Sequence, residues 1–591
     1  MRDLRWTLVL TVLLAVSGCS SPAEEVRAQV RVDQVGFVTD EPKRAYLMSA
    51  DAPGDVRFRV LDEGGTQVLD GVPAGSSTGW NDRYQDVRVL DLSAVTKPGR
   101  YRIEVAGAVS PTFRVDTARA LFGGLVADNL RFFGTQHDSA HVADRTADVY
   151  AAPRYDEEGK RLLDQALTKV GGPVDVSGGW FDAGDFLKFT HTSSYATAQL
   201  LLAQRDSAIR SEALEKEARY GLDWLDRMWD ESTGTLYAQV GIGAGNDAVL
   251  TDHDAWRQPQ DDDALAVAPG DPKFHIKHRP VFRVNEPGLP ISPNLAGRVA
   301  AAFALAAQID SDPARAKREL DQAASLFAKA DTSGKPLVTA FPKNFYPESG
   351  WQDDLEFAAV ELALAGRALN DPRAAQWQTA AEQWATAYLD SDTRGTLGLA
   401  DVSALAHADL ARISTGPLRD RLVGDLARQL DEGMTRAAAD PFGAGAVYTE
   451  FDSVPHALGL VITAGLHRDV TGDDHYAVFG TAQRNWVLGA NAWGSSFVVG
   501  AGSTFPRCPE HQGSNLTGTL LTGAVVNGPN AAGQFAELNA FEGMKPCAVE
   551  GFEPFDGHDA RYLDHVGAWQ SVEAAIDFTS TGLLAFALTT R

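Results

Sequence analysis

Two hydrophobic patterns of different period follow one another along the chain. Near the N-terminus, apolar and charged residues alternate at period two, and turn sequences rich in glycine and proline separate the runs. The clearest runs contain Val56, Phe58 and Val60, and then Tyr101, Ile103 and Val105. Alternation of this kind is typical of antiparallel strands with one buried face. We therefore predict a small all-β sandwich over residues 29–116.

From residue 117 to the C-terminus the apolar positions recur at helical spacing instead. One segment begins at Ser292-Pro293, a typical helix start, and a second follows the same spacing. Their apolar stripes are Leu295, Val299, Ala302, Ala306 and Ile309, and Leu355, Ala358, Leu362, Ala365 and Leu369. Roughly a dozen such segments are joined by long loops, and no strand-like runs alternate with them. We expect a mainly α domain, a barrel of helical hairpins over residues 117–591.

The first residues have the character of an export signal. Arg2 and Arg5 precede an apolar run, Trp6–Val16, that is too short to span a bilayer, so residues 1–18 are predicted to be a signal peptide. The run ends in Val16-Ser17-Gly18-Cys19, which resembles a bacterial lipobox and predicts lipidation of Cys19; ordinary cleavage is the alternative. Residues 19–28 form a polar linker. We expect an exported cell-surface or envelope lipoprotein that contacts the membrane through its lipid anchor only.

Composition narrows the choice of partners and of covalent chemistry. The 591 residues include 53 Lys and Arg against 79 Asp and Glu, a formal net charge of −26, which disfavours nucleic acid as a partner because its binding relies on cationic side chains. Besides Cys19, the chain contains only Cys508 and Cys547. In an oxidising compartment such a pair favours a disulfide, and the spacing does not favour a zinc site.

One loop concentrates acidic and small residues. The segment Asp175–Asp185 contains three carboxylates, three glycines and an aromatic pair within eleven residues. Asp182 and Asp185 are three positions apart and would lie on one side of a turn, with the small Ala183 and Gly184 leaving room for substrate or water. A calcium loop or two helix-capping aspartates are alternatives that the loop by itself leaves open.

Several motifs together resemble the inverting cellulases of glycoside hydrolase family nine and their N-terminal immunoglobulin-like domain. The resemblance extends over nearly all of the mature chain and implies an (α/α)6 barrel preceded by an immunoglobulin-like sandwich. The matching segments are residues 30–37, which resemble the opening strand of the accessory domain, residues 175–185, which resemble the catalytic aspartate motif, and residues 237–241, 252–256, 485–491, 496–500 and 562–577.

The resemblance implies a role for each acidic group. Inverting hydrolysis of a glycosidic bond needs one carboxylate to deprotonate a water and one carboxylic acid to protonate the leaving oxygen. Asp185 corresponds to the base, Asp182 to a group that helps hold the water, and Glu573 to the acid. The resemblance also implies that two further residues are catalytic: His511, in the segment that corresponds to the family's histidine motif, and Asp564, in the segment that carries the acid.

Aromatic platforms for the sugar rings are expected beside these groups. The candidates are His253, Trp256, Tyr448 and Trp569, each of which could instead belong to the core. Trp569, Glu573 and Asp577 are spaced by four residues, so we expect them along one side of a helix, where Trp569 would raise the pKa of Glu573.

A calcium ion is also implied by the resemblance. The segment Ser349-Gly350-Trp351-Gln352-Asp353-Asp354 is similar to the family's calcium loop, and Asp401 fits the distant acidic ligand. Oxygen ligands suit Ca²⁺, which would stiffen the fold. The alternative is that Asp353 and Asp354 only cap the helix that begins near Leu355.

The expected function is inverting hydrolysis of β-1,4 bonds in cellulose or a related β-glucan, of the endoglucanase type. Gly513, Val572 and Phe578 stand where the family commonly has other residues, which leaves the substrate open. One alternative is an exo-β-D-glucosaminidase acting on chitosan oligosaccharides, and another is a non-catalytic carbohydrate-binding lipoprotein. No protein partner is implied.

Overall fold

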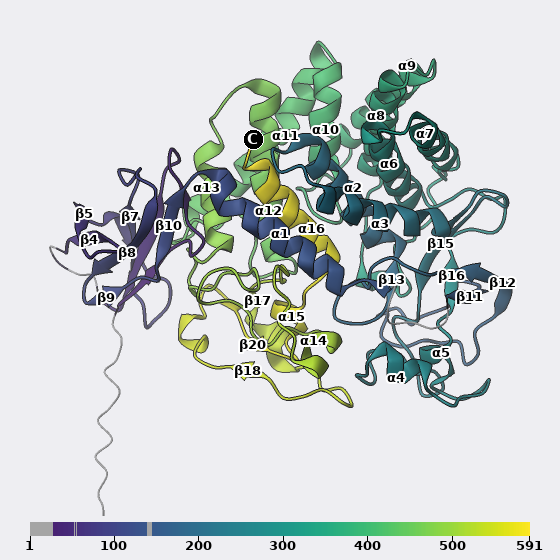
Figure 1. Ribbon diagram of the computed structural model, residues 1–591, viewed down its shortest axis with the longest axis horizontal. Helices are drawn as coiled ribbons and strands as arrows, with labels where there is room; N and C mark the ends of the chain where they lie inside the picture. The colour runs from purple at the N-terminus through teal and green to yellow at the C-terminus, as the bar shows by residue number, and fades with distance from the viewer. Residues whose placement is uncertain (1–27, 52–53, 55, 139–144) are drawn as a thin grey trace, which may run out of the picture.

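The computed structural model describes residues 28–51, 54, 56–138 and 145–591. The predicted signal peptide, Cys19 and all of the linker except Ala28 lie outside the described residues. The described residues form a β-sandwich at one side of the molecule and a larger helical domain beside it (Figure 1). Within those ranges, no helix combines the length and the apolar character needed to cross a bilayer.

Two sheets make the sandwich. The first has the order β1-β3-β7-β6 and the second the order β2-β10-β8-β4-β5, with β9 paired to β8. Val60 pairs with Ile103 across β4 and β8, and both side chains are fully buried, as their alternating pattern predicts. The strands are β1 (Ala28–Arg31), β2 (Phe37–Val38), β3 (Arg44–Ser49), β4 (Phe58–Asp62), β5 (Gln67–Gly71), β6 (Ala74–Thr78), β7 (Asp86–Asp91), β8 (Gly99–Val105), β9 (Ala108–Val109) and β10 (Phe113–Asp116).

The helical domain is a closed double ring of helices, which confirms the predicted fold class. Each inner helix contacts the next one, so that the inner ring α2, α6, α8, α10, α12 and α16 closes, and each packs mainly against one outer helix. The inner helices are α2 (Thr190–Asp206), α6 (Pro293–Ile309), α8 (Gln352–Ala368), α10 (Ser403–Ile413), α12 (Ser453–Thr471) and α16 (Ile576–Leu588). The outer helices are α1 (Ala118–Thr135), α3 (Glu212–Met228), α7 (Pro313–Phe327), α9 (Ala374–Leu389), α11 (Pro417–Ala439) and α13 (Ala477–Val487).

Sequence pattern distinguishes the two rings. All thirteen residues of α16 are buried, because an inner helix is covered by neighbours on every side. The outer helix α3 instead buries only one stripe, which includes Leu214, Ala218, Leu222 and Leu225, and exposes acidic and basic residues on its other face. The first helix of the domain, α1, packs as the outer partner of the last one, α16 (Figure 1).

A small sheet within the helical domain was not expected. Its strands follow the order β12-β11-β16-β15-β13, with β14 paired to β15, and they flank the acidic loop. Every residue of β15 is buried, so the strand has no alternating pattern that the sequence could reveal. The strands are β11 (Thr146–Tyr150), β12 (Lys169–Asp175), β13 (Lys188–Phe189), β14 (Trp229–Asp230), β15 (Thr235–Val240) and β16 (Val281–Arg283).

The remaining elements are short. They are the helices α4 (Pro259–Asp263), α5 (Phe274–Lys277), α14 (Gln512–Thr517) and α15 (Trp569–Val572), the 3-10 turns η2 (Lys343–Phe345), η3 (Ala532–Ala536) and η4 (Glu553–Phe555), and the strands β17 (Asn530–Ala531), β18 (Ala548–Val549), β19 (Ala560–Arg561) and β20 (Asp564–His565).

An aromatic cluster joins the sandwich to the barrel. Trp80 of the sandwich is buried against Phe442, Trp493 and His558 of the barrel, and its indole N–H donates to the backbone oxygen of Phe555 at 2.8 Å. Tyr448 belongs to this cluster as well: it lies 6.0 Å from Trp80, ring to ring, and its hydroxyl donates to Asp440 at 2.6 Å. Tyr448 is half-buried in this contact and is not among the lining residues of the cleft described below, so its contact with substrate stays a prediction.

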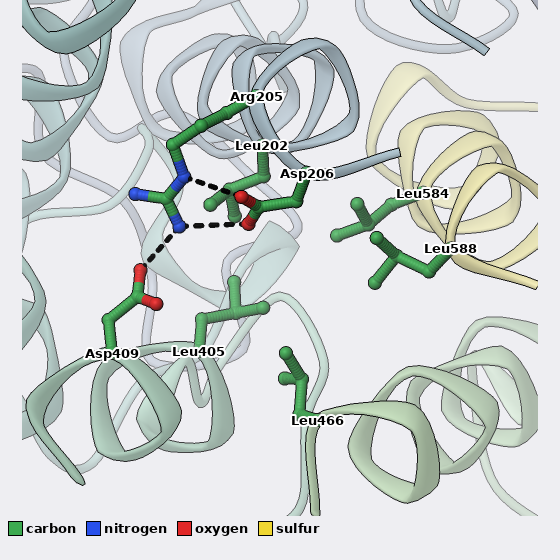
Figure 2. Close-up of a pocket in the computed structure, with 8 residues that line it drawn as sticks. All are labelled: Leu202, Arg205, Asp206, Leu405, Asp409, Leu466, Leu584 and Leu588. Atoms are coloured by element: carbon green, nitrogen blue, oxygen red, sulfur yellow. Dashed lines mark hydrogen bonds and ion pairs between the residues drawn. The ribbon is translucent and has the colours of Figure 1, made fainter. Parts of the chain in front are cut away.

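The two ends of the helix ring differ in the space they leave open. At the C-terminal ends of α2 and α16 there is a cavity of only about 10 Å³, where Arg205 is held between Asp206 and Asp409 (Figure 2). Leu584 and Leu588 of α16 complete its wall. A cavity of that size is too small for a sugar ring.

Candidate active site

A cleft of about 710 Å³ opens at the N-terminal ends of the inner helices. Its lining includes His191 at the start of α2, Tyr346 before α8, Ala400 before α10, Asp452 before α12 and Ala575 before α16. The N-terminus of a helix has a positive partial charge, so this end of the ring is favourable for carboxylates. Asp182, Asp185 and Glu573 all line this cleft, although Glu573 comes from the far end of the chain.

Glycines and a buried lysine shape the acidic loop. Gly178 and Gly179 have positive φ angles of 73° and 77°, and a Cβ at Gly179 would lie 2.5 Å from the Trp224 ring. The Lys188 ammonium donates to the backbone oxygens of Val176 at 2.6 Å and Gly178 at 2.9 Å. The loop is thereby fixed between β12 and β13, and its last residues face the cleft.

Asp182 is held by two hydroxyl groups. Both Thr192 and Tyr346 donate to its carboxylate, and the residue is only 2% exposed. Burial, together with the charge of Asp185, raises the pKa of Asp182 to about 7 against the opposing effect of the two hydroxyls. The backbone of Asp182 also accepts from the Ile576 N–H at 2.9 Å, which ties the acidic loop to the start of α16.

Asp185 has a histidine partner rather than an arginine. His253 donates from Nε2 to one carboxylate oxygen at 2.7 Å, and the Leu187 N–H donates to the other at 3.0 Å. Burial opposes the charged imidazole, but the hydrogen bond and the negative charge of Asp185 prevail and raise the pKa of His253 to about 9. Asp185 is partly exposed to the cleft, as a base that must reach a water has to be.

Glu573 lies at a break between two helices. It follows α15 and has an extended conformation (φ −63°, ψ 134°), and α16 begins only at Ile576. Trp569, Glu573 and Asp577 therefore do not share one helix side, which corrects that expectation. Burial raises the pKa of Glu573 well above its ordinary value, and Glu510, Asp185, Asp182 and Asp452 reinforce the shift. A carboxyl group that keeps its proton near neutral pH suits general-acid catalysis.

Two residues that were assigned to catalysis support the site from behind. His511 is buried outside the cleft lining, where its Nε2 hydrogen bonds with Gln136 at 2.8 Å and its Nδ1 accepts from the Ser514 N–H at 3.1 Å. Burial lowers its pKa to about 4, so it is neutral. Asp564 is 1% exposed and accepts from the backbone N–H groups of Arg507 and Cys508, both at 2.8 Å. The direct catalytic roles expected of His511 and Asp564 do not match these positions.

Aromatic residues face one another along the cleft. Trp256 and His253 line it as expected, together with Phe541, whose ring lies 5.9 Å from that of Trp256. Trp569 also lines it and stacks on Phe451 with ring centroids 4.8 Å apart and an interplanar angle of 16°. Flat apolar rings beside polar groups are the usual lining of a carbohydrate site.

A disulfide fixes one wall of the cleft. Cys508 and Cys547 are bonded, with their Cα atoms 5.4 Å apart. The bond anchors the segment that carries Asn539 and Phe541 to the segment that carries Glu510. On its other side this wall meets the neighbouring loop, since the Trp256 N–H donates to the Glu542 backbone oxygen at 2.6 Å.

The sequence reasoning missed several residues of the cleft. Glu510, Tyr346 and Asp452 line it and carry or contact carboxylates, but Tyr346 and Asp452 belong to loops without a recognised motif. Asp452 has a positive φ of 61°, uncommon for a residue other than glycine, and burial raises its pKa to about 7. Glu510 had a usable signal, because it directly precedes His511 in a segment already singled out.

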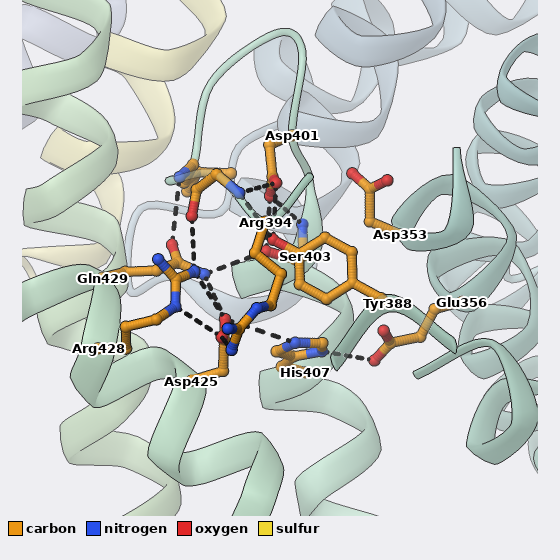
Figure 3. Close-up of polar contacts among 12 residues, drawn as sticks. Asp353, Glu356, Tyr388, Arg394, Asp401, Ser403, His407, Asp425, Arg428 and Gln429 are labelled. Atoms are coloured by element: carbon orange, nitrogen blue, oxygen red, sulfur yellow. Dashed lines mark hydrogen bonds and ion pairs between the residues drawn. The ribbon is translucent and has the colours of Figure 1, made fainter. Parts of the chain in front are cut away.

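The expected calcium ligands lie together only in part. Figure 3 shows Asp353 at the start of α8 opposite Asp401, whose carboxylate accepts from the Tyr388 hydroxyl at 2.7 Å and the Gly395 N–H at 2.9 Å. Burial and the nearby Asp401 raise the pKa of Asp353 to about 8.

Asp354 is engaged differently. One of its oxygens accepts from the Arg298 Nε at 2.6 Å, and the other has no hydrogen-bond partner among the described residues. The arginine supplies the positive charge that a metal ion would otherwise supply to this side chain. Asp353 and Asp401 thus lie near each other, whereas Asp354 is bound to Arg298. Within the described ranges, no three His, Cys, Asp or Glu side chains are grouped as metal ligands.

Comparisons with known proteins agree with this architecture. The family description Glycosyl hydrolase family 9 matches residues 122–586, and the description Cellulase N-terminal ig-like domain matches residues 25–110. The chain is 26% identical to Endoglucanase C of Cellulomonas fimi over 96% of this chain and 52% of that protein, and 22% identical to a xyloglucan-specific endo-beta-1,4-glucanase of Bacteroides ovatus over 98% and 97%.

Similarity in structure extends over almost the whole chain. A metagenome-derived glycoside hydrolase family 9 endoglucanase superposes with a TM-score of 0.72 at 22% identity, over 95% of this chain and 99% of that chain. The chain spans about half the length of Endoglucanase C and 61% of Endoglucanase A of Bacillus pumilus, to which it is 27% identical over 67% of this chain.

Proposed function

Because the chain belongs to glycosyl hydrolase family 9, we propose that it hydrolyses β-1,4-glycosidic bonds of a glucan with inversion at the anomeric carbon. The observation that carries the proposal is that Asp185 and Glu573, remote in sequence, line one sugar-sized cleft. Glu573 donates its proton to the leaving oxygen, and Asp185 removes a proton from the attacking water. Asp182, fixed by Thr192 and Tyr346, orients the acidic loop and the water beside it.

The test is release of reducing sugar from a panel of soluble β-glucans by the wild-type protein and two carboxamide variants. General acid and base catalysis are each worth about 10²–10⁴ in rate, so Asp185→Asn and Glu573→Gln should lower kcat by at least about a hundredfold with little change in thermal stability. Proton NMR of the first product should detect the α-anomer. A non-catalytic carbohydrate-binding protein predicts no turnover by any of the three proteins, and a β-anomer would rule out inversion.

A second candidate substrate follows from the charge of the cleft. None of the lining residues that the structure describes is lysine or arginine. Six carboxyl residues line the cleft: Asp182, Asp185, Glu450, Asp452, Glu510 and Glu573. A lining rich in carboxyl groups and without lysine or arginine suits cationic ligands better than anionic ones, which favours exo-β-D-glucosaminidase action on chitosan oligosaccharides. Running chito-oligosaccharides beside cello-oligosaccharides decides between the two, because the better substrate has the higher kcat/KM.

Calcium binding is a separate part of the proposal. Asp353, Asp401 and the backbone carbonyls of Ser349 and Gly350 would hold Ca²⁺, which would neutralise the two carboxylates and stiffen the start of α8. Addition of Ca²⁺ after EGTA treatment should raise the melting temperature, because a ligand at 100 times its Kd stabilises by about 2.7 kcal/mol. Asp353→Asn should abolish the response, and Asp354→Asn should retain it. An unchanged melting temperature of the wild-type protein would contradict the site.

Export and lipidation complete the proposal. The support is the sequence of residues 1–19, in which a charged start and an apolar run precede Cys19. Cells expressing the full chain should incorporate labelled palmitate into the protein, and Cys19→Ser should prevent it. Recovery of the unlabelled wild-type protein from the culture medium would indicate ordinary signal cleavage instead.

A further inference from the structure

The cleft contains a third carboxyl group that the proposed mechanism does not use. Glu510 is 8% exposed and lines the cleft beside Glu573. Its N–H donates to the backbone oxygen of Val572 at 3.1 Å, and Glu510 and Glu573 pair as neighbours across a parallel β-bridge. Residues paired in this way lie side by side, so the two carboxyl groups are adjacent for reasons of backbone register and not of side-chain chance.

On its other side Glu510 contacts the acidic loop. The Gln512 N–H donates to the backbone oxygen of Gly184 at 2.7 Å, and a Cβ at Gly184 would lie 2.9 Å from the Glu510 Oε2 atom. The Glu510 carboxyl group therefore lies against the residue that precedes Asp185. It occupies a position between the base and the acid of the proposed reaction.

The surroundings of this pair are mostly acidic. The ionisable groups that act on Glu510 or Glu573 are Asp182, Asp185, His253 and Asp452, and the Tyr346 hydroxyl also senses Glu573. His253 is the only one of these that carries positive charge, and it is hydrogen bonded to Asp185. Apart from burial, Glu510 is the largest influence that raises the pKa of Glu573, and burial with Asp185 raises the pKa of Glu510 itself to about 7.

We propose that Glu510 is a positioning residue: its carboxylate keeps the acid proton on Glu573 and favours reprotonation of Glu573 after each turnover. The role rests on the proposed hydrolysis. In the reaction the bond from the anomeric carbon to the leaving oxygen breaks as Glu573 gives that oxygen its proton, and the new bond to water forms as Asp185 accepts a proton. Solvent water then carries a proton from Asp185 back to Glu573, which a neighbouring negative charge promotes.

The test is the pH dependence of kcat/KM in Glu510→Gln, which removes the charge and keeps the shape. Loss of the neighbouring charge should lower the pKa of Glu573, so we expect the basic limb to move to lower pH by about one unit. One pKa unit is a tenfold change in the protonated fraction above the pKa, so activity on that limb should fall about tenfold. Activity on the acidic side should change less than about threefold. Glu510→Asp should restore the wild-type limb, and Glu450→Gln, another acidic residue of the cleft, should leave the limb in place.

A substrate-free measurement separates this inference from the proposed function. In infrared difference spectra, the wild-type protein at pH 7 should have a protonated-carboxyl band that Glu573→Gln removes and that titrates at lower pH in Glu510→Gln. This result would support the role of Glu510 even if no tested glycan were hydrolysed. The proposed role of Glu510 would be overturned if folded Glu510→Gln changed neither the basic limb of kcat/KM nor the titration of the protonated-carboxyl band. A loss of activity confined to amino-sugar substrates would also overturn it, because Glu510 would then be a substrate contact. If Glu510→Gln does not fold, titration of the wild-type band below pH 6 would overturn the role instead.

Discussion

Replacing Arg298 with methionine tests how the barrel keeps its buried charges. Arg298 is 2% exposed and binds Glu348 and Asp354, each with a side chain that is 1% exposed. Glu348 also accepts from the His191 Nε2 at 2.9 Å, and His191 lines the cleft. Arg298→Met therefore leaves two carboxylates buried without their cation and loosens the support of His191.

The expected loss follows from this geometry. Breaking a buried ion pair by removing one partner costs about 3–5 kcal/mol, because the remaining charge is left without compensation. The pKa of Asp354 is already raised well above its ordinary value by burial, so Asp354 takes up a proton and Glu348 accounts for most of the loss. With an unfolding entropy of about 1 kcal/mol per kelvin for a domain of about 470 residues, the melting temperature should fall by about 3–5 °C.

Circular dichroism melts at pH 8 and pH 5 provide the assay. The loss should be larger at pH 8, because at pH 5 the abandoned carboxylates can bind protons. Lys317→Met, which breaks an exposed pair with Asp321 on α7, is the matched control and should cost less than about 1 kcal/mol. Arg298→Met/Glu348→Gln should recover at least half of the loss. A single variant that melts within 1 °C of the wild type, or a double variant no more stable than the single, would refute the reasoning.

Three further predictions concern the cleft. Cys508→Ser/Cys547→Ser opens a loop with a sequence separation of 39, which should lower the free energy of unfolding by about 3–4 kcal/mol through loop entropy and should raise KM. An unchanged KM with altered stability would show that the disulfide does not support the substrate cleft. Phe451→Ala removes the ring stacked on Trp569 and should raise KM about five- to tenfold with a smaller effect on kcat; equal losses in both would contradict a binding platform. The pKa of His253 is raised to about 9, so its stabilising contribution is complete below pH 6.5 and is lost as pH rises toward 9. The wild-type melting temperature should therefore fall between pH 6.5 and 9, and the melting temperature of His253→Gln should fall less steeply.

Local sequence patterns were sufficient to predict a β domain followed by a helical domain, and to predict which face of a helix is buried. The alternation of Val56, Phe58 and Val60 and the stripe from Leu295 to Ile309 depend only on which side of an element is buried, and that information is local. The sequence did not predict the small sheet beside the acidic loop, because β15 is buried on both faces and pairs with strands distant in sequence. Its register depends on tertiary packing.

Knowledge of the site divides in the same way. Asp182, Asp185 and Glu573 were predicted as site residues because each lies in a motif, and the structure places all three in the lining of the cleft. Tyr448 and Asp564 do not line that cleft, because tertiary packing places Tyr448 against Trp80 and Asp564 against the backbone N–H groups of Arg507 and Cys508.

The sequence by itself determined which chemical groups the protein has and how its helices present their apolar faces. Only the tertiary structure decided that Glu510 lies beside Glu573 and that Arg298 forms an ion pair with Asp354. The physical reason is that proton affinity and ion pairing depend on the distance and burial of groups that closure of the helix ring brings together from remote parts of the chain.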